Sequence, residues 1–559
     1  MRRLLLTALV ALAPAVLALP ALAQPADLLL RNGRVHTVDR AGTTTTAVAV
    51  RDGRFVALGA EAERMGARET LDLGGRAVIP GLMDAHLHLH GYAMNAPTVQ
   101  LLGARSIADV VQLIGERAAA TPPGEWVIAS SLWHESLLAE GRLPTRWELD
   151  AVSPNNPVFI PRGGHVVTVN SQGLARSGVT RDTPQPTGGV IVRRDDGEPT
   201  GVLLIAGAIS IARRALPPPP PAAEQARLMV EAMRELNGLG ITGIFEPGIM
   251  GPEAAIYRQL RDDNRMTLRA WVAWRGLNRE SIERGIAAQR DWPQHPMVRP
   301  AGIKFLLDGG VEGGWMTEPY RIVPGEQTNP GYRGILLLPA GGEEEMLEGL
   351  RAVHRAGMQF HTHSVGDATI DLITRLYERV DGELGPVRNL RWNVMHIFLP
   401  TPEALSRMAR LGIMATVQNH PVLLGHNQRR WWGDERAAYS IPIRAILDAG
   451  IQTAGGTDAP VVPGDPFQSM WWMVTRGTLA GYRLGPEQAI TAAEALRIYT
   501  RGTAALLGAE EELGSIEVGK RADLVVLSQD LLTVEPERIR ETRALMTVVE
   551  GRVVHRAGM

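Results

Sequence analysis

The chain of 559 residues has no cysteine and only two lysines, Lys304 and Lys520, among its 58 Lys and Arg residues. The lack of cysteine excludes disulfide bonds and a lipoprotein anchor. A net charge of −2 gives no electrostatic reason to expect a nucleic acid or an anionic membrane as a partner. Hydrophobic residues make up 45% of the chain, so we expect a large core divided between two or three domains.

Only the start of the chain has a long apolar run. Two arginines precede an apolar stretch over residues 4–19, and Ala-Leu-Ala at 21–23 is typical of a signal cleavage site. We predict a signal peptide of residues 1–23, cleavage before Gln24, and a periplasmic or secreted mature protein without a stable membrane anchor. An uncleaved anchor is the alternative, and the choice between Sec and Tat export stays open.

The two ends of the chain share short alternating apolar and polar runs separated by turns, which predicts one small β-domain built from both ends. Between them, strand-like and helical segments alternate, which predicts parallel strands with crossover helices. The fold class we expect is α/β: a (β/α)8 barrel of the TIM type with a small β-sandwich domain. The predicted boundaries are 24–80 and 511–559 for the two parts of the sandwich, 81–510 for the barrel, and about 95–235 for an insertion that walls the pocket.

The segment IPGLMDAHLH, residues 79–88, is an apolar run that ends in two histidines. Residues two apart on an extended strand point to the same face, so we expect His86 and His88 to converge on one point. Neutral imidazole is the commonest protein metal ligand. The pair therefore indicates a metal site, although His-x-His pairs also arise by chance on half-exposed strands.

Lys304 lies in GIKFLLDGG, an apolar run that Asp-Gly-Gly ends, and this pattern predicts a buried strand entering a loop. A buried ammonium is costly unless it is paired or chemically altered. A neutral lysine amine can take up CO2 and become a carbamate, an anionic metal ligand, whereas a guanidinium stays protonated. The alternative is a lysine that pairs with Asp308 or Glu312 inside the core.

Three further apolar runs end in residues that can bind a metal. QFHTHSVGD offers a second His-x-His pair, His361 and His363, while NVMH ends in His396 and AGGTDAP contains Asp458. Each of these residues alone is more often structural. Five strand ends that carry nitrogen or oxygen ligands are nevertheless hard to attribute to chance, and (β/α)8 barrels place their chemistry at the carboxyl ends of the strands.

On these segments the chain resembles the amidohydrolase superfamily, and within it the family 3 branch of metal-dependent hydrolases. The resemblance runs from Ala26 to about Gly551. The segments that carry it are PGLMDAHLH, NSQGL, GEPTGVL, GIKFLLDGG, HSVGD, NVMH, GGTDAPV and the C-terminal GSIEVGKRADLVVLSQD.

The resemblance implies a divalent metal cofactor, with zinc as the expected ion and one or two ions per chain. It implies six ligands: His86, His88, Lys304 as its N6-carboxylated form, His363, His396 and Asp458. The first two histidines and Asp458 would hold the more buried ion, and the carbamate would bridge to the second. Asp458 would also act as general base and then general acid, taking a proton from the attacking water and delivering it to the leaving nitrogen.

The substrate-binding residues are less well defined by the sequence. The resemblance suggests His165, with a structural role as the alternative, and His361 and Trp315 are candidates because their segments are expected near the site. The sequence departs from the branch pattern in three places: at Ile205, in RGGH at 162–165, and in GVE at 310–312. None of these departures removes a proposed ligand, but they put the substrate class in doubt.

We therefore expect a hydrolase that cleaves a C–N bond, in an amide or cyclic amide of a small molecule, by metal-activated hydroxide. One alternative keeps the fold and metals but acts on a lactone or ester, or as a deaminase. Another is a non-catalytic secreted binding protein with a vestigial site, against which the six intact ligand positions argue. Whether the protein forms a homodimer is left open.

Overall fold

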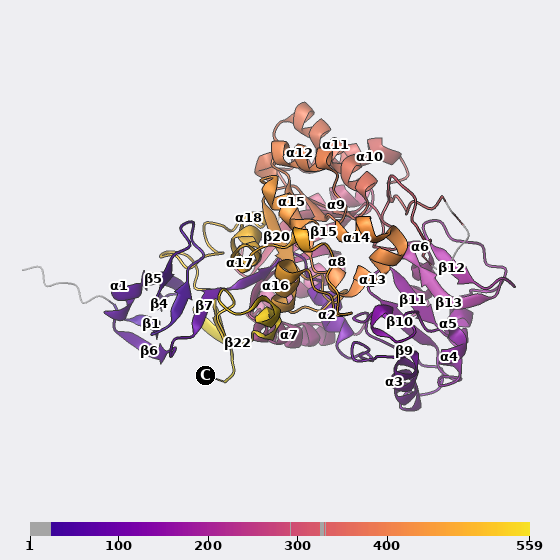
Figure 1. The fold of residues 1–559 in the computed structure, drawn as a ribbon, viewed down its shortest axis with the longest axis horizontal. Helices are drawn as coiled ribbons and strands as arrows, with labels where there is room; N and C mark the ends of the chain where they lie inside the picture. The colour runs from indigo at the N-terminus through magenta and orange to yellow at the C-terminus, as the bar shows by residue number, and fades with distance from the viewer. Residues whose placement is uncertain (1–23, 291, 325–328, 330, 559) are drawn as a thin grey trace, which may run out of the picture.

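The computed structural model describes residues 24–290, 292–324, 329 and 331–558, so the signal peptide predicted for residues 1–23 lies outside the described part. The chain forms three parts, which Figure 1 shows side by side. A β-rich part at the left combines both ends of the chain, a barrel wrapped in helices lies in the centre, and a smaller sheet with its own helices lies at the lower right.

Eight parallel strands form the central barrel, and each pairs with the next one along the sheet. Most of their residues are buried, as expected for parallel strands covered by helices. The first and last strands meet, because the amide of Ala85 donates to the carbonyl of Gly455 at 2.8 Å. The predicted barrel is therefore confirmed. In chain order its strands are β8 (Leu82–Asp84), β14 (Ile241–Ile249), β15 (Arg269–Gly276), β16 (Val298–Leu306), β17 (Phe360–Ser364), β18 (Asn393–His396), β19 (Met414–Gln418) and β20 (Thr453–Gly456).

Amphipathic helices connect these strands and cover the outside of the barrel. They include α7 (Ala222–Gly238), α8 (Gly251–Asp262), α9 (Arg279–Arg290), α10 (Gly342–Arg355), α11 (Asp367–Leu384) and α12 (Pro402–Leu411). Helix α12 shows why they form. The hydroxyl of Thr401 caps its first turn by accepting the amide of Ala404 at 3.1 Å. Leu405, Met408 and Leu411 follow at intervals of three residues and are buried against the core.

Two sheets pack face to face to form the β-sandwich. One runs β5-β4-β1-β6 and the other β23-β22-β21-β7-β2-β3. Leu28 and Leu30 alternate along β1, and Leu524 and Val526 along β21, so that all four side chains enter one core. Both ends of the chain thus share this domain, as the predicted fold class requires. Its strands are β1 (Ala26–Arg31), β2 (Arg34–His36), β3 (Thr44–Thr45), β4 (Val48–Arg51), β5 (Arg54–Leu58), β6 (Ala67–Asp72), β7 (Ala77–Pro80), β21 (Leu524–Leu527), β22 (Ala544–Val549) and β23 (Arg552–Arg556).

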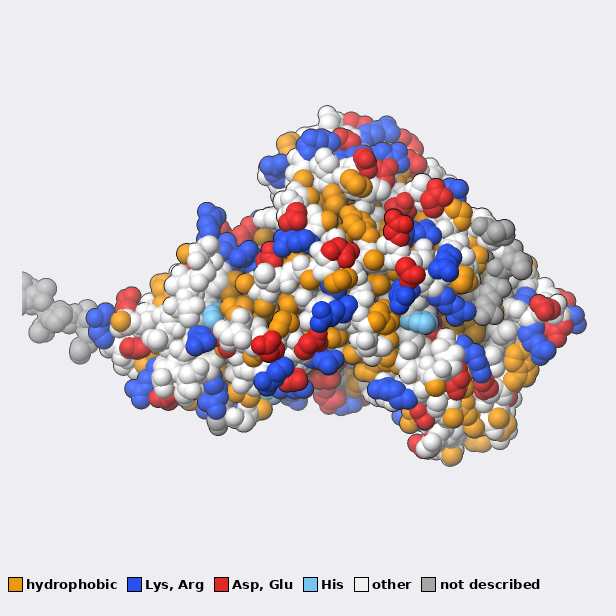
Figure 2. All heavy atoms as spheres, in the orientation of Figure 1, with side chains coloured by type: hydrophobic (Ala, Val, Ile, Leu, Met, Phe, Trp, Pro, Cys, Tyr) orange, Lys and Arg blue, Asp and Glu red, His pale blue; other side chains and the backbone are white. Residues whose placement is uncertain are grey.

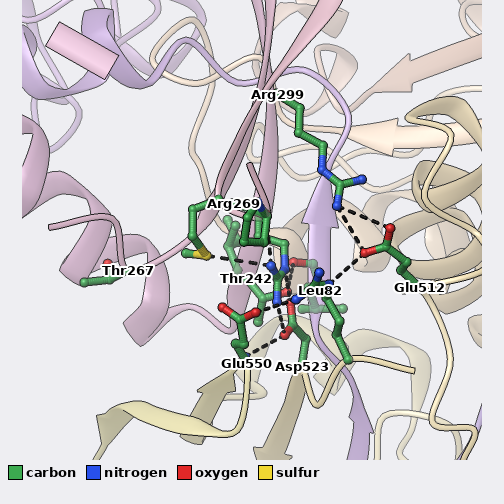
Figure 3. A network of polar contacts seen from close by, with 12 residues as sticks. Leu82, Thr242, Thr267, Arg269, Arg299, Glu512, Asp523 and Glu550 are labelled. Carbon is green, nitrogen blue, oxygen red and sulfur yellow. Dashed lines mark hydrogen bonds and ion pairs between the residues drawn. The ribbon is translucent and has the colours of Figure 1, made fainter. Parts of the chain in front are cut away.

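A buried polar network joins the sandwich to the barrel (Figure 3). The guanidinium of Arg269, at the start of β15, donates two hydrogen bonds of 2.8 and 2.9 Å to the carboxylate of Asp523. Asp523 also accepts the amide of Glu550 at 2.8 Å. Beside it, Arg299 donates to Glu512 at 3.1 and 3.3 Å. These groups lie at the amino ends of barrel strands, so the sandwich is held at the face opposite the predicted chemistry.

The third part of the fold is inserted between β8 and β14. It contains α3 (Ile107–Ala119) and a sheet in the order β12-β13-β11-β10-β9, with bounds Val127–Ile128 for β9, Val158–Arg162 for β10, Val166–Val169 for β11, Val190–Arg193 for β12 and Pro199–Leu204 for β13. Its loops touch the barrel at the carboxyl ends of the strands. The hydroxyl of Ser131 donates to the carbonyl of Pro460 at 3.3 Å, and that of Ser136 to the carbonyl of Leu423 at 2.9 Å. The insertion therefore covers one side of the barrel mouth.

Charged side chains of both signs are interspersed over the face of the molecule that Figure 2 shows, without a broad patch of one sign. Among the described residues, no helix has a stretch that is both long and apolar enough to cross a bilayer. Nothing in the structure tests the predicted lack of a nucleic-acid partner. The question of a homodimer also stays open.

Candidate metal centre

Two histidines and an aspartate converge at the carboxyl ends of the first and last barrel strands. Nε2 of His86 lies 3.4 Å from Oδ1 of Asp458, and Nε2 of His88 lies 3.3 Å from the same oxygen. The two imidazoles therefore meet as predicted, but the reason differs from the prediction. Strand β8 ends at Asp84, so both histidines lie on the loop beyond it and not on an extended strand.

Backbone contacts between the first and last strands fix this loop. The amide of Asp458 donates to the carbonyl of His86 at 2.6 Å, and the amide of His88 donates to the carbonyl of Ala459 at 2.9 Å. Asp458 has a φ of +64°, in the left-handed region that non-glycine residues seldom adopt. Such strain persists where the surrounding structure imposes it, which is common at functional sites.

A second group of potential ligands shares the same aspartate. Nε2 of His420 lies 2.9 Å from Oδ2 of Asp458. One donor atom from each of His396, His420 and Asp458 can be chosen so that all three lie within 4.8 Å of one another. The ring of His363, at the carboxyl end of β17, has its centroid 4.4 Å from that of His396. The two groups thus form one continuous cluster around a buried carboxylate.

His420 is a candidate ligand that the sequence reasoning missed. It lies two residues beyond the end of β19 in the segment MATVQNH, at the same edge of the barrel as His396, the last residue of β18. Its side chain is buried, and Nδ1 has no hydrogen-bond partner among the described residues. The signal that could have found it is the one used for the other strands, an apolar run that ends in histidine.

Lys304 lies near the end of β16, with 7% of its surface exposed. No described residue forms a hydrogen bond or ion pair with its ammonium. The core pairings considered from the sequence are not formed, because Asp308 accepts backbone amides and Glu312 pairs with Arg162. Burial lowers the pKa of Lys304 to about 7, so a large neutral fraction, the form that adds CO2, exists at neutral pH.

The donor set fits a divalent cation such as zinc. Two ligands at about 2.1 Å from a tetrahedral ion are about 3.4 Å apart, which matches the 3.4 and 3.3 Å separations of the His86 and His88 nitrogens from Asp458 Oδ1. That oxygen is buried and has no hydrogen-bond partner among the described residues. Since an unsatisfied buried acceptor costs free energy, a cation at this point would satisfy it.

The charges of these residues suit the same interpretation. Burial would raise the pKa of Asp458, but the surrounding imidazoles outweigh it and hold the pKa well below its usual value. Burial lowers the pKa of His86 and His396, so their imidazoles are neutral. For His88 burial is outweighed by the carboxylates of Asp458 and Glu246, which raise its pKa to about 9. A cation bound there would displace this proton, since metal ligands must be deprotonated.

A pocket opens over the cluster at the barrel mouth. The insertion and the barrel loops supply its walls, and the potential ligands supply its floor. The walls include Trp133, His134, Arg162, His165, Val311, Glu312, Phe398, Leu424 and Val461, and the floor His363, His396, His420 and Asp458. The structure thus places the predicted substrate residue His165 in the pocket, where its ring centroid is 5.9 Å from that of His363.

Two other predicted substrate residues do not line this pocket. His361 lies one layer deeper in the barrel than His363, because it precedes the strand end by two more residues. Its Nε2 is 2.7 Å from the carbonyl of Ala301, and Nδ1 contacts the side-chain amide of Asn393. His361 is therefore a core residue. Trp315 is half-buried, its backbone amide donates to Asp308 at 3.1 Å, and its side chain is not part of the pocket lining.

Fold and site together define a metal-dependent hydrolase built on a (β/α)8 barrel. The chain belongs to the amidohydrolase family, whose model matches residues 69–555. Over 94% of its length it is 31% identical to the N-substituted formamide deformylase of Arthrobacter pascens, of which it covers 98%. The resemblance predicted from the sequence is confirmed.

Solved structures agree on the fold. The chain is similar to an uncharacterized metal-dependent hydrolase from Pyrococcus furiosus, with a TM-score of 0.69, 22% identity, and coverage of 90% of this chain and 100% of the other. It is also similar to an adenosine deaminase from Xanthomonas campestris with bound zinc, with a TM-score of 0.52, 16% identity, and coverage of 95% and 93%.

Proposed function

We propose that the protein hydrolyses the C–N bond of an amide or cyclic amide in a small molecule. One observation carries the proposal: three imidazoles from two different strand ends contact the two oxygens of one buried carboxylate. His86 and His88 lie beside Oδ1 of Asp458, and His420 lies beside Oδ2. The likeness to N-substituted formamide deformylase supports a C–N bond as the target.

The residues that would hold the metal follow from this arrangement. His86, His88 and Asp458 surround one position, and His363 and His396 lie at the adjacent one. Lys304, as its carbamate, would bridge the two positions, and zinc is the ion we propose. When bound, such a cation lowers the pKa of water from about 15.7 to about 7 and polarises a substrate carbonyl.

The protein's own part in the reaction is the movement of one proton. Asp458 is ionised and 6% exposed, so it can accept the proton of the attacking water as the water oxygen bonds to the carbonyl carbon. The same carboxyl then gives this proton to the nitrogen as the C–N bond breaks. His420 contacts the carboxylate at Oδ2 and so fixes its orientation, which leaves Oδ1 directed at the other ligands.

A substrate panel tests this proposal. Metal-replete protein is assayed on N-acyl amines, cyclic amides, lactones and amino-heterocycles, and we expect amine release from at least one amide class. Asp458→Asn should lower kcat by about 100-fold or more, the range for loss of a general base. Asp434→Asn, at an exposed aspartate paired with Arg429, is the matched control and should leave kcat unchanged.

Three other results of this panel would contradict the proposed reaction. Turnover of lactones alone would indicate an esterase-type reaction, and ammonia release from amino-heterocycles would indicate a deaminase. Amide turnover that Asp458→Asn leaves intact would remove Asp458 from the mechanism.

A further inference from the structure

Two of the places where the sequence departs from its family pattern form one ion pair in the structure. Arg162 ends β10 in the insertion, and Glu312 lies in the loop after β16 of the barrel. Nη1 of Arg162 contacts Oε1 of Glu312, and its Nε lies 2.9 Å from Oε2 of Glu135. All three side chains are buried, with exposed fractions of 3 to 5%. We call Glu135, Arg162 and Glu312 the acidic wall.

The acidic wall carries an unbalanced negative charge. Burial would raise the pKa of Glu135, but Arg162 outweighs it and brings the pKa to about 2, and the pKa of Glu312 is lowered in the same way. Burial lowers the pKa of the neighbouring His134 and His165, so both imidazoles are neutral. Two carboxylates therefore face one guanidinium. A buried net charge is costly unless a partner neutralises it.

Glu312 is the member of the acidic wall that remains open to a ligand. Glu135 accepts the side-chain amide of Asn427 at 2.6 Å, whereas Arg162 is the only described residue that forms an ion pair with Glu312. The second carboxylate oxygen of Glu312, Oε2, lies close to Gly310. A Cβ atom built onto Gly310 would be 3.1 Å from this oxygen and 2.6 Å from the ring of His165, so the three groups are neighbours. This carboxylate oxygen is therefore placed at the pocket wall beside His165.

The rest of the pocket wall is largely apolar. Val311, Phe398, Leu424 and Val461 supply aliphatic and aromatic surface near the acidic wall. A ligand that fits both features has an apolar body and a positively charged nitrogen. The apolar surface buries the body, and the carboxylate of Glu312 neutralises the charge.

We propose that the acidic wall determines substrate specificity by binding a positively charged nitrogen of the substrate, with Glu312 as its direct partner. The inference rests on the proposed amide hydrolysis and names the substrate class of the same site: amides that carry an alkylammonium group away from the bond that is cleaved. Arg162 is a positioning residue in this proposal, since its guanidinium holds the carboxylate of Glu312.

Three matched amides test the inference in the unmodified protein. They share one acyl group and one alkyl chain on nitrogen and differ only in the end of the chain, which is an ammonium, a methyl or a carboxylate group. A hydrogen bond to a charged group contributes about 1.5–3 kcal/mol, so we expect kcat/KM for the ammonium substrate to exceed that for the methyl substrate by about 10-fold or more. The carboxylate substrate should be the poorest of the three.

The variant Glu312→Gln measures the contribution of the Glu312 carboxylate charge to substrate preference. Glutamine can still accept from Arg162, so the side chain keeps its place while the wall loses its net charge. The ratio of kcat/KM between the ammonium and methyl substrates should fall to about one. Glu383→Gln is the control, because Glu383 also pairs with arginines but lies near the end of α11 and outside the pocket lining, and it should keep the full ratio. Dissociation constants of the product amines, measured by calorimetry, give a second readout that does not need turnover.

The outcomes separate this inference from the proposed function. Hydrolysis of all three amides with similar kcat/KM would overturn the specificity role and leave amide hydrolysis standing. An equal loss of kcat for every substrate in Glu312→Gln would also overturn it, because it would show that the carboxylate only orients His165. A preference for the carboxylate substrate would overturn it as well and would point to Arg162, the arginine in the pocket lining. Failure to hydrolyse any of the three, with the product amines still bound through Glu312, would instead contradict the proposed function.

Discussion

The carboxylate of Asp84 accepts the hydroxyl of Thr457 at 2.7 Å, and this contact joins the first strand of the barrel to the last. The same carboxylate accepts the amide of His86 at 2.9 Å and the amide of Thr457 at 3.1 Å. His86 and Asp458 are the next potential ligands along each segment. Asp84 therefore sets the backbone positions of two potential metal ligands that come from opposite ends of the barrel sequence.

Lys304→Arg should remove at least one metal ion per chain and nearly all activity. Arginine keeps the positive charge but cannot form a carbamate, so the bridge between the two metal positions is lost. Metal content by atomic emission, with native mass spectrometry for the added CO2, measures the effect. Lys520→Arg is the matched control, since Lys520 is the only other lysine of the chain and hydrogen-bonds to Ser515 and Glu510 in a turn. Full metal content in Lys304→Arg would remove the bridging role.

His420→Ala should weaken metal binding by about 10- to 100-fold, the range seen when a partner of a metal ligand is lost. The reason is its 2.9 Å contact with Oδ2 of Asp458, without which the carboxylate is free to rotate. Titration of the metal-free protein with zinc measures the change. His426→Ala is the control, because His426 lies six residues away on α13 (Pro421–Trp432) and is exposed. Equal zinc affinity in the two variants would show that His420 has no role at the centre.

Asp523→Ala should destabilise the protein by about 3–5 kcal/mol, because it leaves the buried guanidinium of Arg269 without its partner. We expect this substitution to weaken the contact between the sandwich and the barrel. We expect it to leave the chemistry at the opposite face of the barrel unchanged. Urea unfolding at pH 7 measures the destabilisation. Glu69→Ala, at an exposed ion pair with Arg556, should change the midpoint little. A similar small change in Asp523→Ala would show that the junction does not depend on this pair.

The buried pair of Glu135 and Arg162 should make stability fall in acid. Glu135 has a pKa of about 2 in the folded protein, below its ordinary value of 4.5. A lowered carboxyl pKa stabilises the fold above the unfolded pKa, and this contribution is lost as the pH falls through the folded pKa. Glu135→Gln should therefore cost about 2 kcal/mol more at pH 6 than at pH 3. Urea unfolding of both proteins at several pH values measures the difference. A constant cost across this range would contradict the assignment.

The barrel could be predicted from the sequence because its parallel strands are short, buried and apolar, and helices with clear periodicity separate them. The same logic located the carboxyl ends, where His363, His396 and Asp458 lie. It failed for the local geometry of the first histidine pair, because the loop after Asp84 is shaped by contacts with Ala459, more than 370 residues later in the chain.

The pocket wall could not be predicted in the same way. The pairing of Arg162 with Glu312 joins an inserted sheet to a barrel loop, and no local pattern connects two residues that far apart. The sequence made His361 a candidate substrate-binding residue because its segment ends near the site. Within a layered barrel interior, however, His361 contacts Ala301 and Asn393 in the core, whereas His363 at the strand end reaches the mouth.

The central claim is that a bound divalent metal is required for hydrolysis. Measuring the metal content of the protein, and its activity with and without metal, tests this claim most directly. Purified protein is analysed for bound divalent metal, stripped with a chelator, assayed on the amide panel and then reloaded with zinc. The account predicts one or two ions per chain, loss of nearly all activity on stripping and its recovery on reloading. Metal-free protein that hydrolyses amides at the full rate would contradict it.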